Sequence, residues 1–277
     1  MKTPSLAVLL AGATALLAPG VATASGLQPG RMVVYEAGAF VPESQLSDLG
    51  APADLGGTVL EGDPKISARV DHAHEGVLAG VFQATRGKVL IHFPFTEHAT
   101  ILEGEVRLTD QWGNRQSLQA GDSYFIRQGS DILWEVRGPR VQKSFFNRTE
   151  PSDSPAPMIV HHAHDKLAQS ELTDLGPPEG LGGTVVSGDP EISARIDFAD
   201  GPASAGVFQA TRGDVRIGFP FTEHATVLHG AVTLTDASGA QQRLDVGDSY
   251  LIRQTSSIFW QVDSSRVQKS FFNVVEG

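Results

Sequence analysis

An internal repeat constrains the fold of this chain more than any other feature of its sequence. Residues 44–147 and 170–273 align without a gap, and each matching residue lies 126 positions after its counterpart, as Val207 does after Val81. Three blocks of the first stretch return unchanged in the second: Val81–Gly87, Phe93–Thr100 and Arg140–Asn147. A solenoid unit has only about 20–50 residues, so a repeat of this length is a whole domain. The sequence therefore predicts one domain in two tandem copies.

The segments around the repeat set the expected domain boundaries. Residues 148–157 are polar and rich in proline, which is typical of an exposed linker. The apolar start of the chain has no counterpart before the second copy. We therefore expect a signal peptide over residues 1–24, a first domain over 25–147, a linker over 148–157 and a second domain over 158–277.

The first residues have the pattern of a cleavable Sec-type signal. Lys2 provides a positive start, Leu6–Ala18 is an apolar run, and Ala22-Thr23-Ala24 is a small-residue cleavage site. A membrane-spanning helix needs roughly 20 apolar residues, more than this run supplies. We expect cleavage near Ala24, a periplasmic or secreted protein, and no membrane insertion of the mature chain.

Composition excludes several classes of function. Hydrophobic residues make up 40% of the 277 and charged residues 19%, which is sufficient for packed cores. A formal net charge of −11 disfavours binding to nucleic acid or anionic lipid, because both require a positive surface. The chain has no cysteine, so disulfides, thiolate metal sites and cysteine nucleophiles are excluded.

Short alternating strands predict an all-β fold. Apolar residues alternate with others around Val89–Phe93 and Ile132–Val136, and turns rich in Gly, Asp and Pro separate such segments. Long helical periodicity is missing. This pattern favours a small barrel or a sandwich, and periodicity alone leaves an immunoglobulin-like sandwich open.

Two segments resemble the cupin superfamily and favour the barrel. The segment 94–106, with Glu97 and the ending Leu102-Glu103-Gly104, is similar to the first cupin motif, and residues 121–129 are similar to the start of the second. Trp134 and Trp260 add a resemblance to the (S)-ureidoglycine aminohydrolase cupin domain. The resemblance implies two tandem cupin barrels, also described as jelly rolls or double-stranded β-helices. It further implies that the two barrels of one chain pair with each other, and further homo-oligomers are possible.

The resemblance also implies a divalent metal site, which the sequence fills incompletely. The cation would be Mn, Fe, Zn or Ni, held by a glutamate and three histidines at about 2.0–2.2 Å. The glutamate falls on Glu97 in the first copy and on Glu223 in the second. The three histidine positions fall on Leu90, His92 and Ile132 in the first copy and on Arg216, Gly218 and Ile258 in the second. We therefore predict degenerate sites, with His92 and Glu97 as the remaining metal candidates of the first domain.

Without a cation, a carboxylate inside a barrel needs another partner, because an unpaired buried charge is very unfavourable. The residues at former ligand positions suggest which partners these are. We predict that Arg216 pairs with Glu223 and that His92 pairs with Glu97.

Further repeated residues are weaker candidates. Arg127 and Arg253 are expected near the barrel mouth, where a guanidinium suits a carboxylate, and the two tryptophans are expected to fill the barrel or form an aromatic floor. His98 and His224 follow the glutamates and are expected to point outward, toward a contact between barrels. The histidines of 161–164 and of 72–74 are expected at the surface.

These observations favour an exported bicupin that binds a small polar or acidic molecule without a catalytic metal. The residues expected to bind it are His92, Glu97, Arg127, Trp134, Arg216, Glu223, Arg253 and Trp260. Two alternatives stay open: a metal-dependent enzyme of the ureidoglycine aminohydrolase or dioxygenase kind, and a structural or interaction protein whose barrels are filled with side chains.

Overall fold

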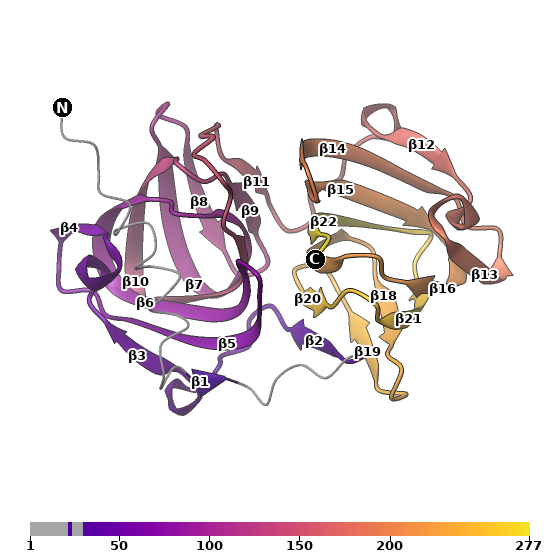
Figure 1. Ribbon diagram of the computed structural model, residues 1–277, viewed down its shortest axis with the longest axis horizontal. Helices are drawn as coiled ribbons and strands as arrows, with labels where there is room; N and C mark the ends of the chain where they lie inside the picture. The colour runs from indigo at the N-terminus through magenta and orange to yellow at the C-terminus, as the bar shows by residue number, and fades with distance from the viewer. Residues whose placement is uncertain (1–21, 24–29) are drawn as a thin grey trace. The chain divides into compact units, whose positions relative to one another are not determined.

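Two β-rich units make up the computed structural model, which describes residues 22–23 and 30–277 (Figure 1). Of these residues, the first unit contains 22–23 and 38–160, and the second contains 30–37 and 161–277. The predicted signal peptide lies outside the described residues, apart from the short strand β1 (Ala22–Thr23). No helix in the described part of the chain is long and apolar enough to cross a membrane.

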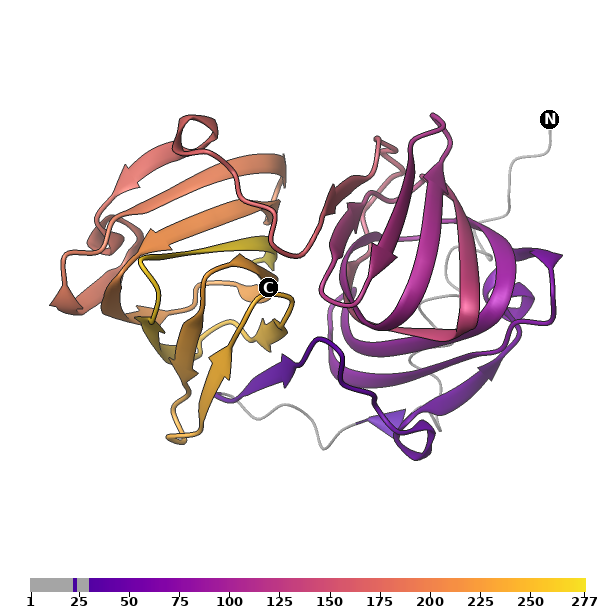
Figure 2. The same cartoon turned by 180° about the vertical axis from the view of Figure 1, so that it is seen from behind.

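The first unit is a ten-stranded sheet in which β1, β5, β6, β10, β7, β9 and β11 follow one another. Strands β3, β4 and β8 branch from β5, β6 and β7. Its strands are β1, β3 (Ser47–Gly50), β4 (Thr58–Glu61), β5 (Ile66–His74), β6 (Val77–His92), β7 (Thr96–Asp110), β8 (Arg115–Gln119), β9 (Ser123–Ile126), β10 (Asp131–Arg148) and β11 (Ile159–His161). Strands β6, β7 and β10 have 16, 15 and 18 residues, well above the usual length, and curve visibly around the unit (Figures 1 and 2).

The second unit forms two sheets, of seven and of five strands. The seven-stranded sheet has the order β12-β14-β15-β22-β17-β20-β2, and the five-stranded sheet has the order β13-β16-β21-β18-β19. Their bounds are β2 (Met32–Tyr35), β12 (Thr173–Gly176), β13 (Gly183–Gly188), β14 (Ile192–Asp200), β15 (Ala203–Thr211), β16 (Gly213–Gly218), β17 (Thr222–His229), β18 (Val232–Thr235), β19 (Gln241–Leu244), β20 (Ser249–Ile252), β21 (Ser257–Val262) and β22 (Arg266–Val274). Each long strand of the first unit thus corresponds to two shorter strands here.

Helical structure within the described residues is limited to four short 3-10 turns: η1 (Glu43–Gln45), η2 (Pro52–Leu55), η3 (Gln169–Glu171) and η4 (Pro178–Leu181). The proline at the start of η2 and of η4 suits a first helical turn, where its missing N–H has no partner to lose. The predicted all-β fold class is confirmed.

The division into units differs from the predicted contiguous domains at the first strand of each repeat. Strand β2, which begins the first repeat, pairs antiparallel with β20 in the sheet of the second unit. Strand β11, which begins the second repeat, follows β9 at the end of the first unit's sheet. The predicted linker over 148–157 therefore belongs to the first unit. An alignment of repeats does not reveal this exchange, because it contains no information on which sheet edge a strand joins.

A large apolar cluster fills the interior of each unit. In the second unit, Tyr250 and Phe271 from the seven-stranded sheet pack in one cluster with Trp260 from the five-stranded sheet. Tyr124, Trp134 and the neighbouring apolar residues form the equivalent cluster in the first unit. The core therefore lies between two layers of strands, as in a jelly roll.

Gly104 holds a bulge beside the interior of the first unit. The register of β7 against β10 shifts between Gln142 and Lys143, so β7 carries an extra residue there. Gly104 follows with a φ of +85°, and a Cβ at this position would lie 2.3 Å from the carbonyl oxygen of Arg140. Gly230 is in the equivalent situation. Only glycine combines this φ with so close a backbone approach.

We predict that Gly104→Ala destabilises the first unit more than Gly113→Ala does. Gly113 also has a positive φ, +87°, but a Cβ there would meet nothing within 4 Å. Its substitution should therefore cost only the conformational term of about 1–2 kcal/mol, whereas Gly104→Ala adds a backbone clash. Urea unfolding of both variants measures the difference, and equal losses of unfolding free energy would contradict it.

Candidate functional site

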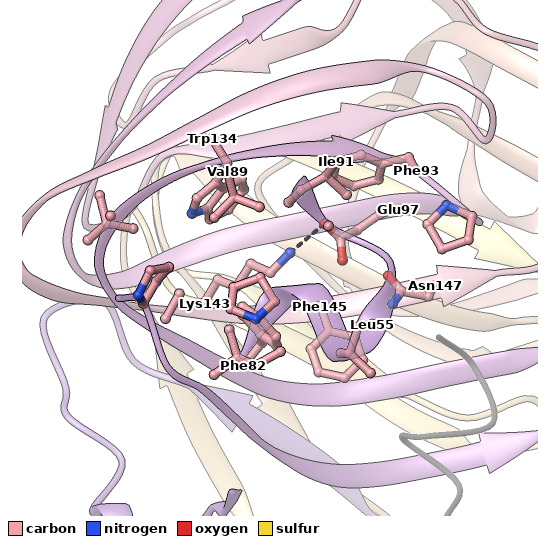
Figure 3. A pocket seen from close by; sticks show the side chains of 18 of the residues that line it. Leu55, Phe82, Val89, Ile91, Phe93, Glu97, Trp134, Lys143, Phe145 and Asn147 are labelled. Atoms are coloured by element: carbon pink, nitrogen blue, oxygen red, sulfur yellow. Dashed lines mark hydrogen bonds and ion pairs between the residues drawn. The ribbon is translucent and has the colours of Figure 1, made fainter. Parts of the chain in front are cut away.

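A buried carboxylate, ammonium and phenol meet inside the first unit. Glu97 is 2% exposed, and its Oε1 accepts hydrogen bonds from Lys143 Nζ at 2.5 Å and from the Tyr124 hydroxyl at 2.5 Å. Lys143 Nζ also donates to the Tyr124 oxygen at 2.6 Å. Figure 3 shows the amino group of Lys143 pointing at Glu97 between aromatic and apolar side chains. We call this group of three residues the interior triad.

The second unit contains the same triad. Lys269 Nζ lies 2.5 Å from Glu223 Oε1 and 2.6 Å from the Tyr250 oxygen, and the Tyr250 hydroxyl donates to Glu223 at 2.6 Å. All three residues are buried. The interior triad is therefore a property of the repeated domain.

Three adjacent strands bring the triad together. Strand β7 supplies Glu97, and its two neighbours β10 and β9 supply Lys143 and Tyr124. Side chains two residues apart on a strand share a face, so Lys143, Phe145 and Asn147 all line the interior. Asn147 lies directly opposite Glu97 in the β7–β10 ladder.

Burial shapes the electrostatics of the triad. Desolvation lowers the pKa of Lys143, and the charge of Glu97 and the hydrogen bond to it oppose this shift. Desolvation, with Glu97 acting in the same direction, raises the pKa of Tyr124 well above its ordinary value. The same causes shift the pKa values of Lys269 and Tyr250 in the same directions. Tyr124 therefore acts as a neutral hydroxyl at any ordinary pH.

Aromatic rings surround each ammonium. Lys143 Nζ lies 5.0 Å from the ring centroid of Trp134 and 5.3 Å from those of Phe82 and Tyr124. Lys269 has the equivalent neighbours at 4.9–5.3 Å. At these distances the ring quadrupoles favour a cation, which offsets part of the desolvation cost.

A cavity adjoins the triad in each unit. It measures about 120 Å³ in the first unit and about 300 Å³ in the second. Glu97 and Lys143 line the first cavity and Glu223 and Lys269 the second, while the remaining walls are mainly aliphatic and aromatic. A mostly apolar cavity with a few converging polar groups is the usual form of a small-molecule site.

The second cavity has a more exposed apolar rim. Leu181 and Ile196 line it and are 61% and 55% exposed. Val70, the counterpart of Ile196, is only 4% exposed, and β1 pairs with β5 at this residue. The two copies thus have the same interior chemistry and different entrances.

In each cavity wall, one atom of each of two polar side chains is buried without a hydrogen-bond partner among the described residues. Among the described residues, Trp134 Nε1 and Asn147 Oδ1 have none in the first unit, and Trp260 Nε1 and Asn273 Oδ1 have none in the second. All four residues line the cavities. Buried groups of this kind are rare and call for an explanation such as a bound molecule.

The predicted pairing of His92 with Glu97 is wrong. The side chain of His92 is 48% exposed, with Nδ1 2.8 Å from Asp131 and Nε2 3.5 Å from Asp153. Ile91, its neighbour in the sequence, lines the cavity instead. The prediction placed the strand one residue out of register, and a shift by one residue reverses which side chains face inward.

The predicted pairing of Arg216 with Glu223 is wrong for the same reason. Arg216 is exposed, and its guanidinium lies 5.8 Å from the ring centroid of Phe259. Ile217 faces the cavity. Lys269 occupies the place that the prediction assigned to Arg216.

The other predicted ligand-binding residues divide into two groups. Trp134 and Trp260 line the cavities, beside the triad lysines. Arg127 is absent from the cavity wall and hydrogen-bonds Ser154 in the segment that follows β10. Arg253 likewise does not line the second cavity. Ligand binding by any of them stays a prediction.

Two of the histidines predicted to lie at the surface are buried, whereas His164 is exposed as predicted. His161 is 7% exposed and His72 is 6% exposed, so the prediction that they lie at the surface is wrong. Desolvation lowers the pKa of His161 to about 4. His224 is fully buried, its ring centroid lies 6.1 Å from that of Tyr35 on β2, and desolvation lowers its pKa to about 3. A contact of His98 and His224 between the barrels stays a prediction.

The interior of each barrel does not fit a metal ion. Among the described residues that line the first cavity, Glu97 is the one carboxylate, and its Oε1 is engaged by an ammonium and a hydroxyl. Ile91, Phe93 and Trp134 supply the neighbouring wall. In the described part of the chain, no three His, Cys, Asp or Glu residues are grouped to hold a cation. Lys143 provides the positive charge that a cation would otherwise supply.

Sequence reasoning missed the lysine and tyrosine of the triad. Lys143 lies within Arg140–Asn147, a block that is identical in both copies, at a position where the alternating pattern turns it toward the apolar face. Tyr124 lies in a repeated Asp-Ser-Tyr segment. The feature that could have revealed the triad is a lysine that both copies repeat at an inward strand position.

The jelly-roll fold and the inward carboxylate on the first motif define the class of each unit, a cupin domain. The EutQ-like cupin domain model, Cupin_3, matches residues 72–145 and 198–271, which together make up more than half of the chain. The chain therefore belongs to this cupin family, with two copies of the domain. No curated protein matches the chain.

Solved structures agree with this fold. A protein of unknown function of the DUF861 family from Pseudomonas syringae pv. tomato is 20% identical with a TM-score of 0.68, over 89% of this chain and 100% of that one. A putative glyoxylate-induced protein from Pseudomonas aeruginosa is 13% identical with a TM-score of 0.50, over 94% of each chain. A cupin 2 conserved barrel domain protein from Leptotrichia buccalis is 10% identical with a TM-score of 0.50, over 76% and 88%. These similarities concern the fold alone.

We predict that Lys143→Met lowers the unfolding free energy of the first unit by about 3–5 kcal/mol, because it leaves the buried carboxylate of Glu97 without its cation. Adding Glu97→Gln should recover most of the loss, since the Tyr124 hydroxyl can still donate to the amide oxygen. Denaturant unfolding of the two single variants and the double variant measures the coupling. Additive losses would contradict an ion pair, and Lys269→Met is the matched test in the second unit.

We predict that acid destabilises the second unit through His224. Its pKa is about 3 in the folded protein and about 6.5 when unfolded, so the unfolded state gains a proton first as the pH falls. The associated stability is complete above pH 6.5 and is lost progressively toward pH 3, by about 2 kcal/mol at pH 5. Unfolding of wild type and His224→Gln at pH 7.5 and 5 measures this. His162→Gln is the control, and an equal pH dependence in the wild type and His224→Gln would contradict the prediction.

Proposed function

We propose that each barrel binds a small organic molecule with an apolar body and a polar or acidic head group, without a metal ion. The apolar walls of the cavity would hold the body. The head group would lie at the end formed by the interior triad, Trp134 and Asn147 in the first unit, or by their counterparts in the second.

One observation carries this proposal. Within the part of the chain that the structure describes, the same indole N–H and the same amide oxygen are buried without a partner in both cavity walls. A buried polar group without a hydrogen bond costs roughly 1–3 kcal/mol. Two such groups at equivalent positions in two copies are explained if a ligand with its own donor and acceptor satisfies them.

The triad supports an acceptor oxygen on the ligand. An ammonium has three N–H donors, and Lys143 uses two of them on Glu97 and Tyr124. Among the described residues it has no third partner, and its side chain lines the cavity. A carbonyl or carboxylate oxygen could therefore accept from Lys143 while the ligand body packs against Phe82 and Phe145.

Several predictions on cellular context belong to the same proposal. We propose that the protein acts in the periplasm or outside the cell after removal of residues 1–24. We also propose that the two barrels of one chain pair with each other. The donor set of the triad gives no support to the metal-dependent enzyme, so that alternative is not proposed.

The test uses fluorescence of the cavity tryptophans. The chain has three tryptophans, and Trp112 is exposed outside the cavities, so Trp112→Phe leaves only Trp134 and Trp260. Titration of this variant with butyrate, butyramide and 1-butanol should give a saturable change in emission for the compounds that bind. A ligand at 100 times its Kd should also raise the unfolding free energy by about 2.7 kcal/mol.

Two further variants separate the cavities. Trp134→Phe in the Trp112→Phe background reports only on the second cavity, and Trp260→Phe only on the first. We expect the larger second cavity to accept longer homologues, such as hexanoate and hexanamide, than the first. Absence of both a saturable fluorescence change and a rise in melting temperature across this series would overturn the proposal.

A further inference from the structure

The triad lysines differ from every other lysine that the structure describes. Lys143 and Lys269 are 6% and 5% exposed, whereas Lys65 and Lys166 are exposed and Lys88 is partly exposed. Buried lysine is among the rarest of residues, and an ion pair alone seldom justifies it, because an apolar replacement of the pair is often as stable. A chemical role for the amine would account for its position.

We infer that Lys143 and Lys269 form imines with small carbonyl compounds that enter the cavities. This inference deepens the proposed function, on which it rests, by naming the substrate class as aldehydes or ketones with a short apolar body. It stands on four features of each site: an amine at the cavity wall, a carboxylate and a hydroxyl both within 2.6 Å of it, and apolar surroundings.

The first step requires a neutral amine. Glu97 Oε1 lies 2.5 Å from Lys143 Nζ, so it can take one proton from the ammonium directly. Desolvation lowers the pKa of Lys143, which favours loss of a proton from its ammonium. The lone pair of the amine then attacks the carbonyl carbon, and the C=O π electrons move to the oxygen.

The later steps need one proton shuttle and one proton donor. The nitrogen of the adduct loses a proton and its oxygen gains one, giving a neutral carbinolamine. Tyr124 lies 2.6 Å from Nζ and can pass this proton through its hydroxyl without ionising. The proton stored on Glu97 then leaves with the carbinolamine hydroxyl as water, and a protonated imine remains.

The reaction steps balance in atoms and in charge, which suits a buried site. One carbonyl compound and one lysine ammonium become one protonated imine and one water, with no oxidant or reductant. The charge on the lysine nitrogen is +1 before and after, and Glu97 is again a carboxylate. The buried ion pair, with its coulombic contact and surrounding rings, is therefore kept in the product.

The experiment is reductive trapping of wild-type protein with butyraldehyde and sodium cyanoborohydride at pH 7, followed by peptide mass spectrometry. We expect one butyl group on Lys143 and on Lys269, gained faster than on Lys65 and Lys166, since desolvation lowers the pKa of both triad lysines and so raises the fraction of neutral amine. Exposed lysines in the same chain thus serve as internal standards.

Tyr124→Phe is the variant that tests the shuttle. It keeps the ring and removes the hydroxyl, so butylation of Lys143 should slow while that of Lys269 in the same molecule is unchanged. Tyr250→Phe should give the reverse pattern. Melting curves of both variants establish that they are folded, and a fall at both lysines in either variant would count against a local role of the hydroxyl.

Failure of this inference is distinguishable from failure of the proposed function. Butylation confined to exposed lysines, together with saturable binding of butyramide by tryptophan fluorescence, would overturn imine formation and keep the cavity as a binding site. Selective butylation of Lys143 and Lys269 that butyramide suppresses supports both. No selective butylation and no binding of butyramide or butyrate would overturn both.

Discussion

An ammonium held 2.5 Å from a carboxylate inside an apolar barrel is the interaction on which each unit of this protein depends. Neither charge could be buried alone, so Glu97 requires Lys143 and Lys143 requires Glu97. The pair ties strand β7 to β10, and the hydroxyl of Tyr124 adds the next strand, β9. The same ion pair forms the polar end of the cavity, where the proposed ligand would place its head group.

The duplication preserved this interior and changed its surroundings. Both units contain the same triad, the same tryptophan and the same asparagine, yet one cavity measures about 120 Å³ and the other about 300 Å³. Strands that are continuous in the first unit are divided in the second, and the rim residue Ile196 is exposed where Val70 is buried. The two units therefore have the same polar groups at cavities of different size and different rim exposure.

The predicted interior position of the two carboxylates agrees with the structure, whereas their predicted partners were wrong. Motif spacing identifies Glu97 and Glu223 as inward residues, and the structure places both at a cavity. The predicted partners were wrong because His92 and Arg216 lie one residue away from the inward positions. In a strand, a shift of one residue moves a side chain to the opposite face. The true partner is 46 residues away from Glu97 in the sequence, beyond the reach of any local motif.

The sequence by itself determined the duplication and the all-β class, because these follow from repetition and from a local period of two. Its resemblance to the first cupin motif located the interior carboxylates. Tertiary structure alone decided that β2 joins the second unit and β11 the first, and that a lysine from β10 neutralises the acid on β7. Strand partners are chosen among segments far apart in the chain. Which strands pair depends on which sheet edges meet when the sheet curves. The residues next to each strand in the sequence do not specify this pairing.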